Sequence, residues 1–454
     1  MDIDAYFEGR REAILADWFE LLRMQTIGSD LSHLGDCARC AAWLKRYLRP
    51  LGFDSEVILP ANGGMPLFLA TREGEPSAPS VLYYGHYDVQ PADPLELWET
   101  PPFEPTIRDG RVYARGAQDN KGQFFAFLQG VRALVESGAR LPPLTILLEG
   151  EEESGSVHLA EELPNIRRRI AAQILMACDT EVAPDGRPAI VAGLRGVVHL
   201  TVTVSGAPRD LHSGTHGGVA PNPAQALARM LASMHGDNGE ILVEGFAGGV
   251  RPPTEREREL ASAGALDDTG YEAATGVKPT GGERGFAPWE RAGFRPAIEV
   301  NGIHGGYGGP GSKTIIPASA FAKLSARIVP GQSPKACVDA ISAHLKARCP
   351  DGLRVEFSEI QATGGALRLP VASPLCRVAS DVISRIDPRG PVFQWDGASM
   401  PIVASLADAS GATPLLVGFG AEGDRIHAPN ESYSIDQFKT TMRYACEMLS
   451  ALAG

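Results

Sequence analysis

The chain contains 454 residues, of which 44% are hydrophobic and 21% charged, a composition typical of globular proteins. Its length exceeds what one compact core usually holds, so we expect two domains. A net charge of −13 argues against a nucleic-acid partner, which needs a basic surface, and no apolar run approaches the roughly 20 residues that cross a bilayer.

The first 50 or so residues predict two helices with apolar stripes. Residues 1–22 are amphipathic and acidic and lack the uninterrupted apolar core of a signal peptide, so we expect a cytoplasmic location. The seven cysteines form an odd set without framework spacing, which fits reduced thiols. Cys37 and Cys40 form a CxxC within a helical pattern. A redox pair usually follows a strand, so we interpret this pair as structural.

After these helices, short apolar runs alternate with helical patterns. The runs 80–86, 144–150 and 174–179 predict buried strands of a largely parallel sheet. Helices are expected near 120–138 and 156–171. The alternation predicts an α/β domain, in which ligands bind beyond the carboxyl ends of the strands.

A different pattern begins at residue 196, where an alternating strand, a helix and a further strand–helix–strand order predict an inserted α+β domain. Residues 236–312 are rich in glycine, proline and charge, and we assign no elements to them. The α/β character returns near 363 and ends in a helix over 434–452. The expected domains are 1–195 with 363–454, interrupted by 196–362.

Potential metal ligands gather near the ends of the predicted strands. His86, Glu153 and Asp179 follow strands, Asp119 precedes a helix, and His427 lies in the returning segment. Zinc accepts such nitrogen and oxygen donors. If Asp119 bridges two ions, His86 and Asp179 complete one site. Glu153 and His427 then complete the other, and each ion keeps an open position for water or substrate.

Each motif alone has a plainer interpretation. His86 and Asp88 also fit a buried histidine–carboxylate pair, rather than a ligand whose other ring nitrogen donates to Asp88. Asp119 also suits a helix N-cap, and the acidic stretch 149–153 a solvated loop. The ordered set favours a two-metal hydrolase in which one of the adjacent Glu152 and Glu153 holds a metal and the other moves the proton of the attacking water.

Further candidates lie in the predicted inserted domain. His212 belongs to the glycine-rich segment DLHSGTHGG (210–218), which suggests an exposed loop able to approach another surface. Arg327 ends a predicted strand and could bind a carboxylate in a bidentate fork. A plain loop histidine and a surface ion pair are the respective alternatives.

With these motifs in order, the chain resembles the dizinc exopeptidase and deacylase family. That family includes carnosinase-type dipeptidases, carboxypeptidase G-type enzymes, aminoacylases and succinyl-diaminopimelate desuccinylase. The motifs that carry the resemblance are GHYDV (85–89), GAQDNKG (116–122), EGEEESGS (149–156), ACDTE (177–181), DLHSGTHGG (210–218) and HAPNE (427–431). The stretch 295–334 most resembles the dipeptidase branch.

The resemblance implies a catalytic α/β domain interrupted by a lid domain that also forms a homodimer. It implies two zinc ions per subunit, with manganese or cobalt as alternatives, bridged by Asp119. By the same resemblance, Glu152 is the general base and Asp88 supports His86. The peptide bond after the bridging aspartate is cis in relatives, which suggests the same conformation for Asp119–Asn120.

Residues of the lid and the returning segment can also be matched. By resemblance, His212 is the lid histidine that reaches the partner subunit's active site and stabilises the oxyanion. Asn301, Arg327 and Ser399 match positions that hold substrate.

These observations predict metal-dependent hydrolysis of peptide bonds in dipeptides or small peptides. The alternative is an N-acyl or carbamoyl amino acid amidohydrolase that uses the same site, since both reactions break an amide by the same attack. A noncatalytic binding protein on this scaffold would be expected to lack a ligand or the base, and this chain has all of them.

Overall fold

The computed structural model describes residues 2–397 and 400–454, which form two compact units. The first unit contains residues 2–192, Leu369–Gln394 and Ser405–Gly454, and the second contains Gly193–Arg368 with residues 395–397 and 400–404. The sequence pattern predicts the last two of these segments as part of the first domain. They instead group with the second unit, where the ring of Trp395 lies 5.1 Å from that of Phe294.

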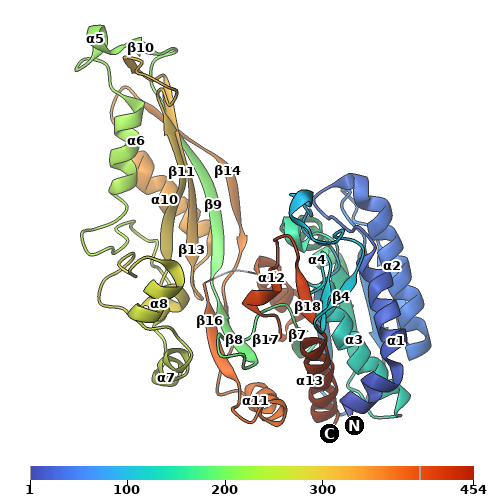
Figure 1. Ribbon diagram of the computed structural model, residues 1–454. Helices are drawn as coiled ribbons and strands as arrows, with labels where there is room; N and C mark the ends of the chain where they lie inside the picture. The colour runs from blue at the N-terminus through green and yellow to red at the C-terminus, as the bar shows by residue number, and fades with distance from the viewer. Residues whose placement is uncertain (1, 398–399) are drawn as a thin grey trace. The chain divides into compact units, whose positions relative to one another are not determined.

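A nine-stranded sheet lies mainly in the first unit, with parallel strands at its centre and antiparallel strands outside (Figure 1). The residues of β3 are all buried, as expected for a strand covered on both faces. In spatial order the strands are β1 (Asp54–Ile58), β2 (Leu67–Arg72), β6 (Leu144–Glu149), β3 (Val81–His86), β7 (Ile174–Ala177), β17 (Thr413–Gly418), β8 (Ala189–Leu194) and β15 (Leu367–Arg368), with β16 (Val392–Asp396) also paired to β8.

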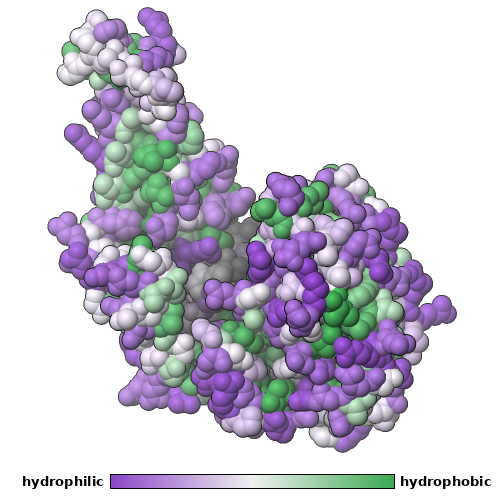
Figure 2. Space-filling view, in the orientation of Figure 1, coloured by the Kyte–Doolittle hydropathy of each residue, from purple (hydrophilic) through white to green (hydrophobic). Residues whose placement is uncertain are grey.

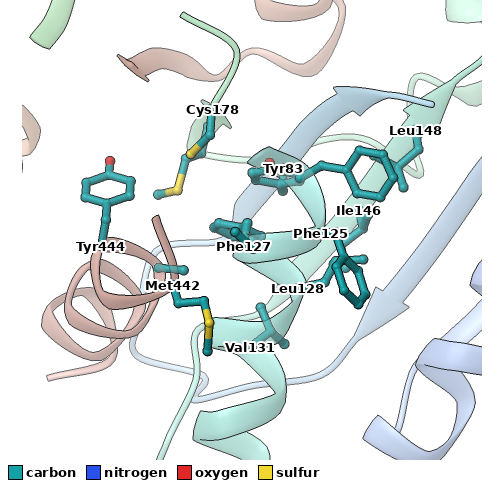
Figure 3. Packing of buried hydrophobic residues seen from close by; sticks show 14 of the residues in the cluster. Tyr83, Phe125, Phe127, Leu128, Val131, Ile146, Leu148, Cys178, Met442 and Tyr444 are labelled. Carbon is teal, nitrogen blue, oxygen red and sulfur yellow. The ribbon is translucent and has the colours of Figure 1, made fainter. Parts of the chain in front are cut away.

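Helices flank this sheet, and α3 and α13 pack against each other. The ring of Tyr83 in β3 stacks on Phe127 in α3, with centroids 3.7 Å apart (Figure 3). This contact fixes the strand that ends at His86 against the helix that follows Asp119. The helices are α1 (Ile3–Leu22), α2 (Leu34–Leu48), α3 (Lys121–Glu136), α4 (Val157–Ile166), α11 (Pro374–Ile386), α12 (Pro401–Ser410) and α13 (Ile435–Ala453).

A small antiparallel sheet in the first unit joins the C-terminal segment to the loop region before α3. Its strands, in spatial order, are β18 (Ser432–Ser434), β5 (Arg111–Tyr113) and β4 (Thr106–Arg108). Cys37 and Cys40 are buried in α2, and burial raises the pKa of both thiols to about 12. All seven cysteines are free thiols.

The second unit is built on a four-stranded antiparallel sheet. Its strands, in spatial order, are β11 (Ala297–Gly305), β13 (Ser319–Ile328), β9 (Gly196–Ser205) and β14 (Arg354–Gly364). Helices α6 (Pro223–Ala232) and α10 (Pro334–Ala347) pack on this sheet and share its apolar core (Figure 1). A short ladder of β10 (Leu211–His212) and β12 (Ile315–Ile316) lies next to α5 (Ser213–His216).

The stretch 236–312, to which the sequence analysis assigned no elements, contains three short helices and strand β11. The helices are α7 (Glu255–Ala263), α8 (Asp268–Thr275) and α9 (Pro288–Phe294). The visible face of each unit carries many hydrophilic side chains with hydrophobic patches between them (Figure 2). Within residues 2–397 and 400–454, no helix has the length and apolar character needed to span a membrane.

Candidate active site

His86 ends strand β3, so its ring lies at the carboxyl edge of the parallel strands, where α/β domains bind ligands. Its Nε2 lies 3.2 Å from Oδ1 of Asp119 and 3.5 Å from Oδ2 of Asp179. Its Nδ1 lies 3.3 Å from Oδ1 of Asp88. Carboxylates therefore face both ring nitrogens, and Asp88 holds the nitrogen that points away from the other two.

Asp119 lies in the loop before α3, and its two carboxylate oxygens face different imidazoles. Oδ1 faces His86, whereas Oδ2 lies 3.0 Å from Nε2 of His427. The N-cap of α3 is Asn120, which removes the interpretation of Asp119 as a helix cap. The Asp119–Asn120 peptide bond is cis, as the resemblance suggested.

Two groups of three potential ligands result, and within each group the ligand atoms lie within 4.8 Å of one another. One group contains His86, Asp119 and Asp179; the other contains Asp119, Glu153 and His427. We call them the buried group and the open group, because the side chain of His86 is 1% exposed and that of His427 is 51% exposed. The structure thus brings the five predicted ligands together around a shared aspartate.

Neighbouring amides orient two of these ligands. Nδ2 of Asn120 donates a 2.5 Å hydrogen bond to Oδ1 of Asp179. Nε2 of Gln90 donates a 2.8 Å hydrogen bond to Oε2 of Glu153. The sequence analysis missed both amides, although the position of Asn120 directly after Asp119 was a usable signal.

Asp88 also holds the segment that follows β6. The backbone N–H groups of Glu152 and Glu153, in the 3₁₀ helix η4 (Glu152–Ser154), donate to Oδ1 and Oδ2 of Asp88 at 3.2 and 3.1 Å. Burial raises the pKa of the Glu152 carboxyl well above its ordinary value; His86 opposes this shift and Asp179 adds to it. A carboxyl group that binds a proton beside the ligand groups is suited to general acid–base chemistry.

The acidic stretch after β6 is not a solvated loop, since Glu149 is 0% and Glu151 8% exposed. The hydroxyl groups of Tyr84 and Ser156 donate to Oε1 of Glu149 at 2.7 and 2.9 Å. Burial raises the pKa of Glu149 to about 8. Glu151 pairs with Nδ1 of His158 at 2.8 Å. The stretch therefore supports the site from within the fold.

The electrostatics of the two groups fit divalent cations. Burial alone would lower the pKa of His86, but Asp179 and Asp119 raise it well above its ordinary value. Hydrogen bonds to Asp119 and Glu153 raise the pKa of His427 to about 10. The carboxylates therefore stabilise positive charge on the imidazole rings of both His86 and His427. A cation bound in each group would supply that positive charge in place of the ring proton. The donor set, two imidazoles with three carboxylates, suits zinc.

The remaining candidates lie in the second unit or outside the described residues. His212 is exposed in β10, and its Nδ1 accepts a 3.0 Å hydrogen bond from the N–H of Gly214, which leaves Nε2 as its donor. Asn301 is exposed at an irregularity of β11. Arg327 lies half-buried near the end of β13, opposite Ala297. Ser399 falls outside the described residues.

Comparison with known proteins places these observations in a family. The sequence model of peptidase family M20/M25/M40 matches residues 82–451. The chain therefore belongs to this family, and it is a metal-dependent peptidase. The predicted family and enzyme class are confirmed.

Two relatives are similar in sequence to this chain over most of its length. The Cys-Gly metallodipeptidase DUG1 of Saccharomyces cerevisiae is 30% identical over 404 residues, which cover 87% of this chain and 83% of the relative. The Beta-Ala-His dipeptidase of Homo sapiens is 31% identical over 423 residues, which cover 91% of this chain and 81% of the relative.

Solved structures agree over nearly the whole chain. An M20 family metallo-carboxypeptidase from Sulfolobus solfataricus aligns with a TM-score of 0.82 and 29% identity, covering 97% of this chain and 99% of its own. The dipeptidase Dug1p from Saccharomyces cerevisiae aligns with a TM-score of 0.78 and 25% identity, covering 99% and 98%. The predicted α/β fold with an inserted domain is confirmed.

Proposed function

We propose that this chain is a dipeptidase with a dinuclear metal site formed by the buried group and the open group. The observation that carries the proposal is the Asp119 carboxylate, whose two oxygens face His86 and His427 from opposite groups. One carboxylate placed between two sets of ligands suits a pair of closely spaced metal ions, since each of its oxygens can bind one ion. We propose zinc as the metal, with manganese or cobalt as alternatives, because imidazole and carboxylate ligands bind all three.

Two bound cations would activate a water molecule and polarise the scissile carbonyl. Glu152 would accept the proton of that water on its carboxylate and pass it to the leaving amine. Asp88 would keep this geometry in place, since it holds the ring of His86 and the backbone of Glu152 through separate contacts.

We propose that the second unit acts as the lid and dimerisation domain and supplies groups for the substrate. The Nε2 of His212 is a donor at the exposed end of β10, which suits stabilisation of an oxyanion across a homodimer. Arg327 and Asn301 would bind the substrate's terminal groups, and Ser399 would contact it as well. We place the enzyme in the cytoplasm, which fits its acidic charge and free thiols.

The names of the relatives support dipeptides as the substrate class, because those proteins are called Cys-Gly and Beta-Ala-His dipeptidases. Metal-stripped protein, reloaded with zinc or manganese, should therefore hydrolyse free dipeptides in a mass-spectrometric assay. Blocking either terminus, by N-acetylation or C-amidation of the same dipeptides, should abolish cleavage. Cleavage confined to the acylated compounds would instead identify an N-acyl or carbamoyl amino acid amidohydrolase, and no cleavage of any compound would contradict amide hydrolysis by this site.

A further inference from the structure

Glu431 is a buried carboxylate that gathers four hydrogen bonds from the loop that carries Asp119. Oε2 accepts from Nη1 of Arg115 at 2.8 Å and from the N–H of Gly116 at 2.9 Å. Oε1 accepts from the N–H of Gln118 at 3.0 Å and from the N–H of Asp119 itself at 3.1 Å. The side chain of Glu431 is only 1% exposed, so solvent does not compete for these donors.

The chain around Glu431 is tied to the same loop through its backbone. The N–H of Ala114 donates to the carbonyl of Glu431 at 3.1 Å, and Ser432 in β18 pairs with Tyr113 in β5. Arg115 is buried as well, and its Nη2 donates to the carbonyl of Pro91 at 3.1 Å. The Asp119 loop is therefore held by both carboxylate oxygens of Glu431 and by the adjacent pairing of β5 with β18.

The segment that carries Glu431 also carries His427. His427 and Asn430 have left-handed backbone conformations, with φ of 61° and 63°, which are uncommon for non-glycine residues, although Asn and His adopt them more often than most. Asn430 is anchored by its side chain, since Oδ1 accepts from the N–H of Glu99 at 2.8 Å and Nδ2 donates to the carbonyl of Leu97 at 2.9 Å. One short segment thus supplies a ligand of the open group and the carboxylate that orients Asp119.

We propose that Glu431 is a positioning residue that sets the Asp119 carboxylate for both groups at once. The inference rests on the proposed dinuclear site. Asp119 is the residue common to the two groups, so a shift of its loop would weaken both metal sites together. Loss of a ligand that belongs to one group, such as His427, would weaken one site directly.

Glu431→Gln is the informative substitution, because an amide offers one acceptor oxygen where the carboxylate offers two. Its NH₂ group would face N–H donors on one side, either those of Arg115 and Gly116 or those of Gln118 and Asp119. Hydrogen-bond partners of ligating residues typically account for about 10–100-fold in metal affinity. We expect Glu431→Gln to weaken binding of both ions by about that factor, and Glu431→Asp, which keeps the charge, to recover part of the loss.

Asp424 provides a matched control in the same C-terminal part of the chain. It is equally buried and pairs with Arg111, and it accepts from the N–H of Ala421 at 2.7 Å and Nε2 of Gln437 at 3.0 Å. Its partners lie outside the Asp119 loop. Asp424→Asn removes the same kind of buried, arginine-paired charge, and we expect it to leave both metal affinities unchanged.

The experiment is a cobalt titration of the full-length, metal-stripped protein, read by calorimetry and by the visible absorption of bound Co²⁺. The wild type, Glu431→Gln, Glu431→Asp, Asp424→Asn and His427→Ala would be compared, with thermal unfolding of each metal-free protein recorded alongside. We expect two weakened sites and an altered Co²⁺ spectrum in Glu431→Gln, one directly weakened site in His427→Ala, and wild-type binding in Asp424→Asn.

The outcomes separate this inference from the proposed function. A wild type that binds fewer than two ions would overturn the dinuclear proposal itself. A wild type that binds two ions, beside a Glu431→Gln variant with unchanged affinities or with loss at one site alone, would overturn only the role of Glu431. Failure of both Glu431 variants to fold, while Asp424→Asn folds, would identify a general folding residue and also overturn it.

Discussion

The buried group and the open group share Asp119 but differ in how the protein holds their other ligands. In the buried group, His86 is 1% exposed, Asp88 faces its second ring nitrogen, and Asn120 donates to Asp179. In the open group, the His427 side chain is half-exposed, and its backbone adopts a left-handed conformation. The buried group thus lies at the edge of the central sheet, whereas the open group depends on a surface segment that supplies His427.

This difference indicates that the two groups have different roles, one in holding an ion tightly and the other in access from solvent. Ligands fixed by packing and hydrogen bonds lose little freedom when a cation binds, so the buried group should hold its ion more tightly. A half-exposed imidazole leaves the open group reachable from solvent. Ion exchange and substrate approach should therefore occur on the open side.

The largest effect is expected from Glu152, which belongs to neither group. Glu152→Ala removes the proposed proton acceptor and should lower kcat on a dipeptide by about 10²–10⁴-fold. Both groups keep their ligands, so metal content measured by mass spectrometry should not change. Glu151→Gln is the matched control, because Glu151 is one residue away but pairs with His158. Retained turnover in Glu152→Ala would remove Glu152 from the reaction.

A smaller loss of turnover is expected from His212, which lies in the second unit. Removing one donor to a developing oxyanion typically costs about 10²–10³-fold in kcat, so His212→Ala should lose turnover within that range and keep its metal. Mixing His212→Ala with Glu152→Ala should restore part of the activity if a homodimer shares its sites. Absence of rescue after verified subunit exchange would contradict sharing, while normal turnover in His212→Ala would exclude the residue from catalysis.

The comparison between the two groups is tested directly by His86→Ala and His427→Ala. Each should weaken cobalt binding at its own group by more than about 100-fold, since outer partners of ligands alone account for 10–100-fold. Only His86→Ala should also lower the melting temperature of the metal-free protein, because it leaves buried carboxylates without their cationic partner. Equal losses of stability in both variants would refute the distinction between a built-in and a surface-closed group.

Much of this site was predictable from sequence because its ligands follow recognisable strand ends. Continuous apolar runs predicted β3, β6 and β7, and the residues after them fell where an α/β sheet binds ligands. The contacts of Glu431 and Asn120 were not predicted. They depend on loops that meet only in three dimensions. Asn120 could have been suspected from its place directly after Asp119, whereas Glu431 carries no sequence pattern that reveals its partners.

The stretch 236–312 shows why other elements were missed. Helix α7 has few buried residues and begins with a capping box between Thr254 and Glu257. Glu257 also pairs with Arg368, far along the chain. A helix stabilised by caps and ion pairs lacks the apolar stripe on which periodicity depends. Strand β11 is also largely exposed, so the alternation of buried and exposed residues along it is weak.

The last prediction concerns stability rather than turnover or metal binding, and it involves Glu149, which lies behind the buried group. Burial raises the pKa of this carboxyl from 4.5 to about 8, so between these values the folded metal-free protein binds a proton that the unfolded chain releases. The free energy of unfolding should therefore fall as pH rises through this window and level off above it, by about 1.4 kcal/mol for each pKa unit of difference. Glu149→Gln keeps an acceptor for Tyr84 and cannot ionise, so its metal-free form should lose this part of the pH dependence and exceed the wild type in stability at pH 8. The measurement is urea denaturation of both proteins from pH 5 to 8. If their free energies of unfolding change with pH in parallel, Glu149 ionises normally. The interior behind the buried group is then more polar than its packing indicates.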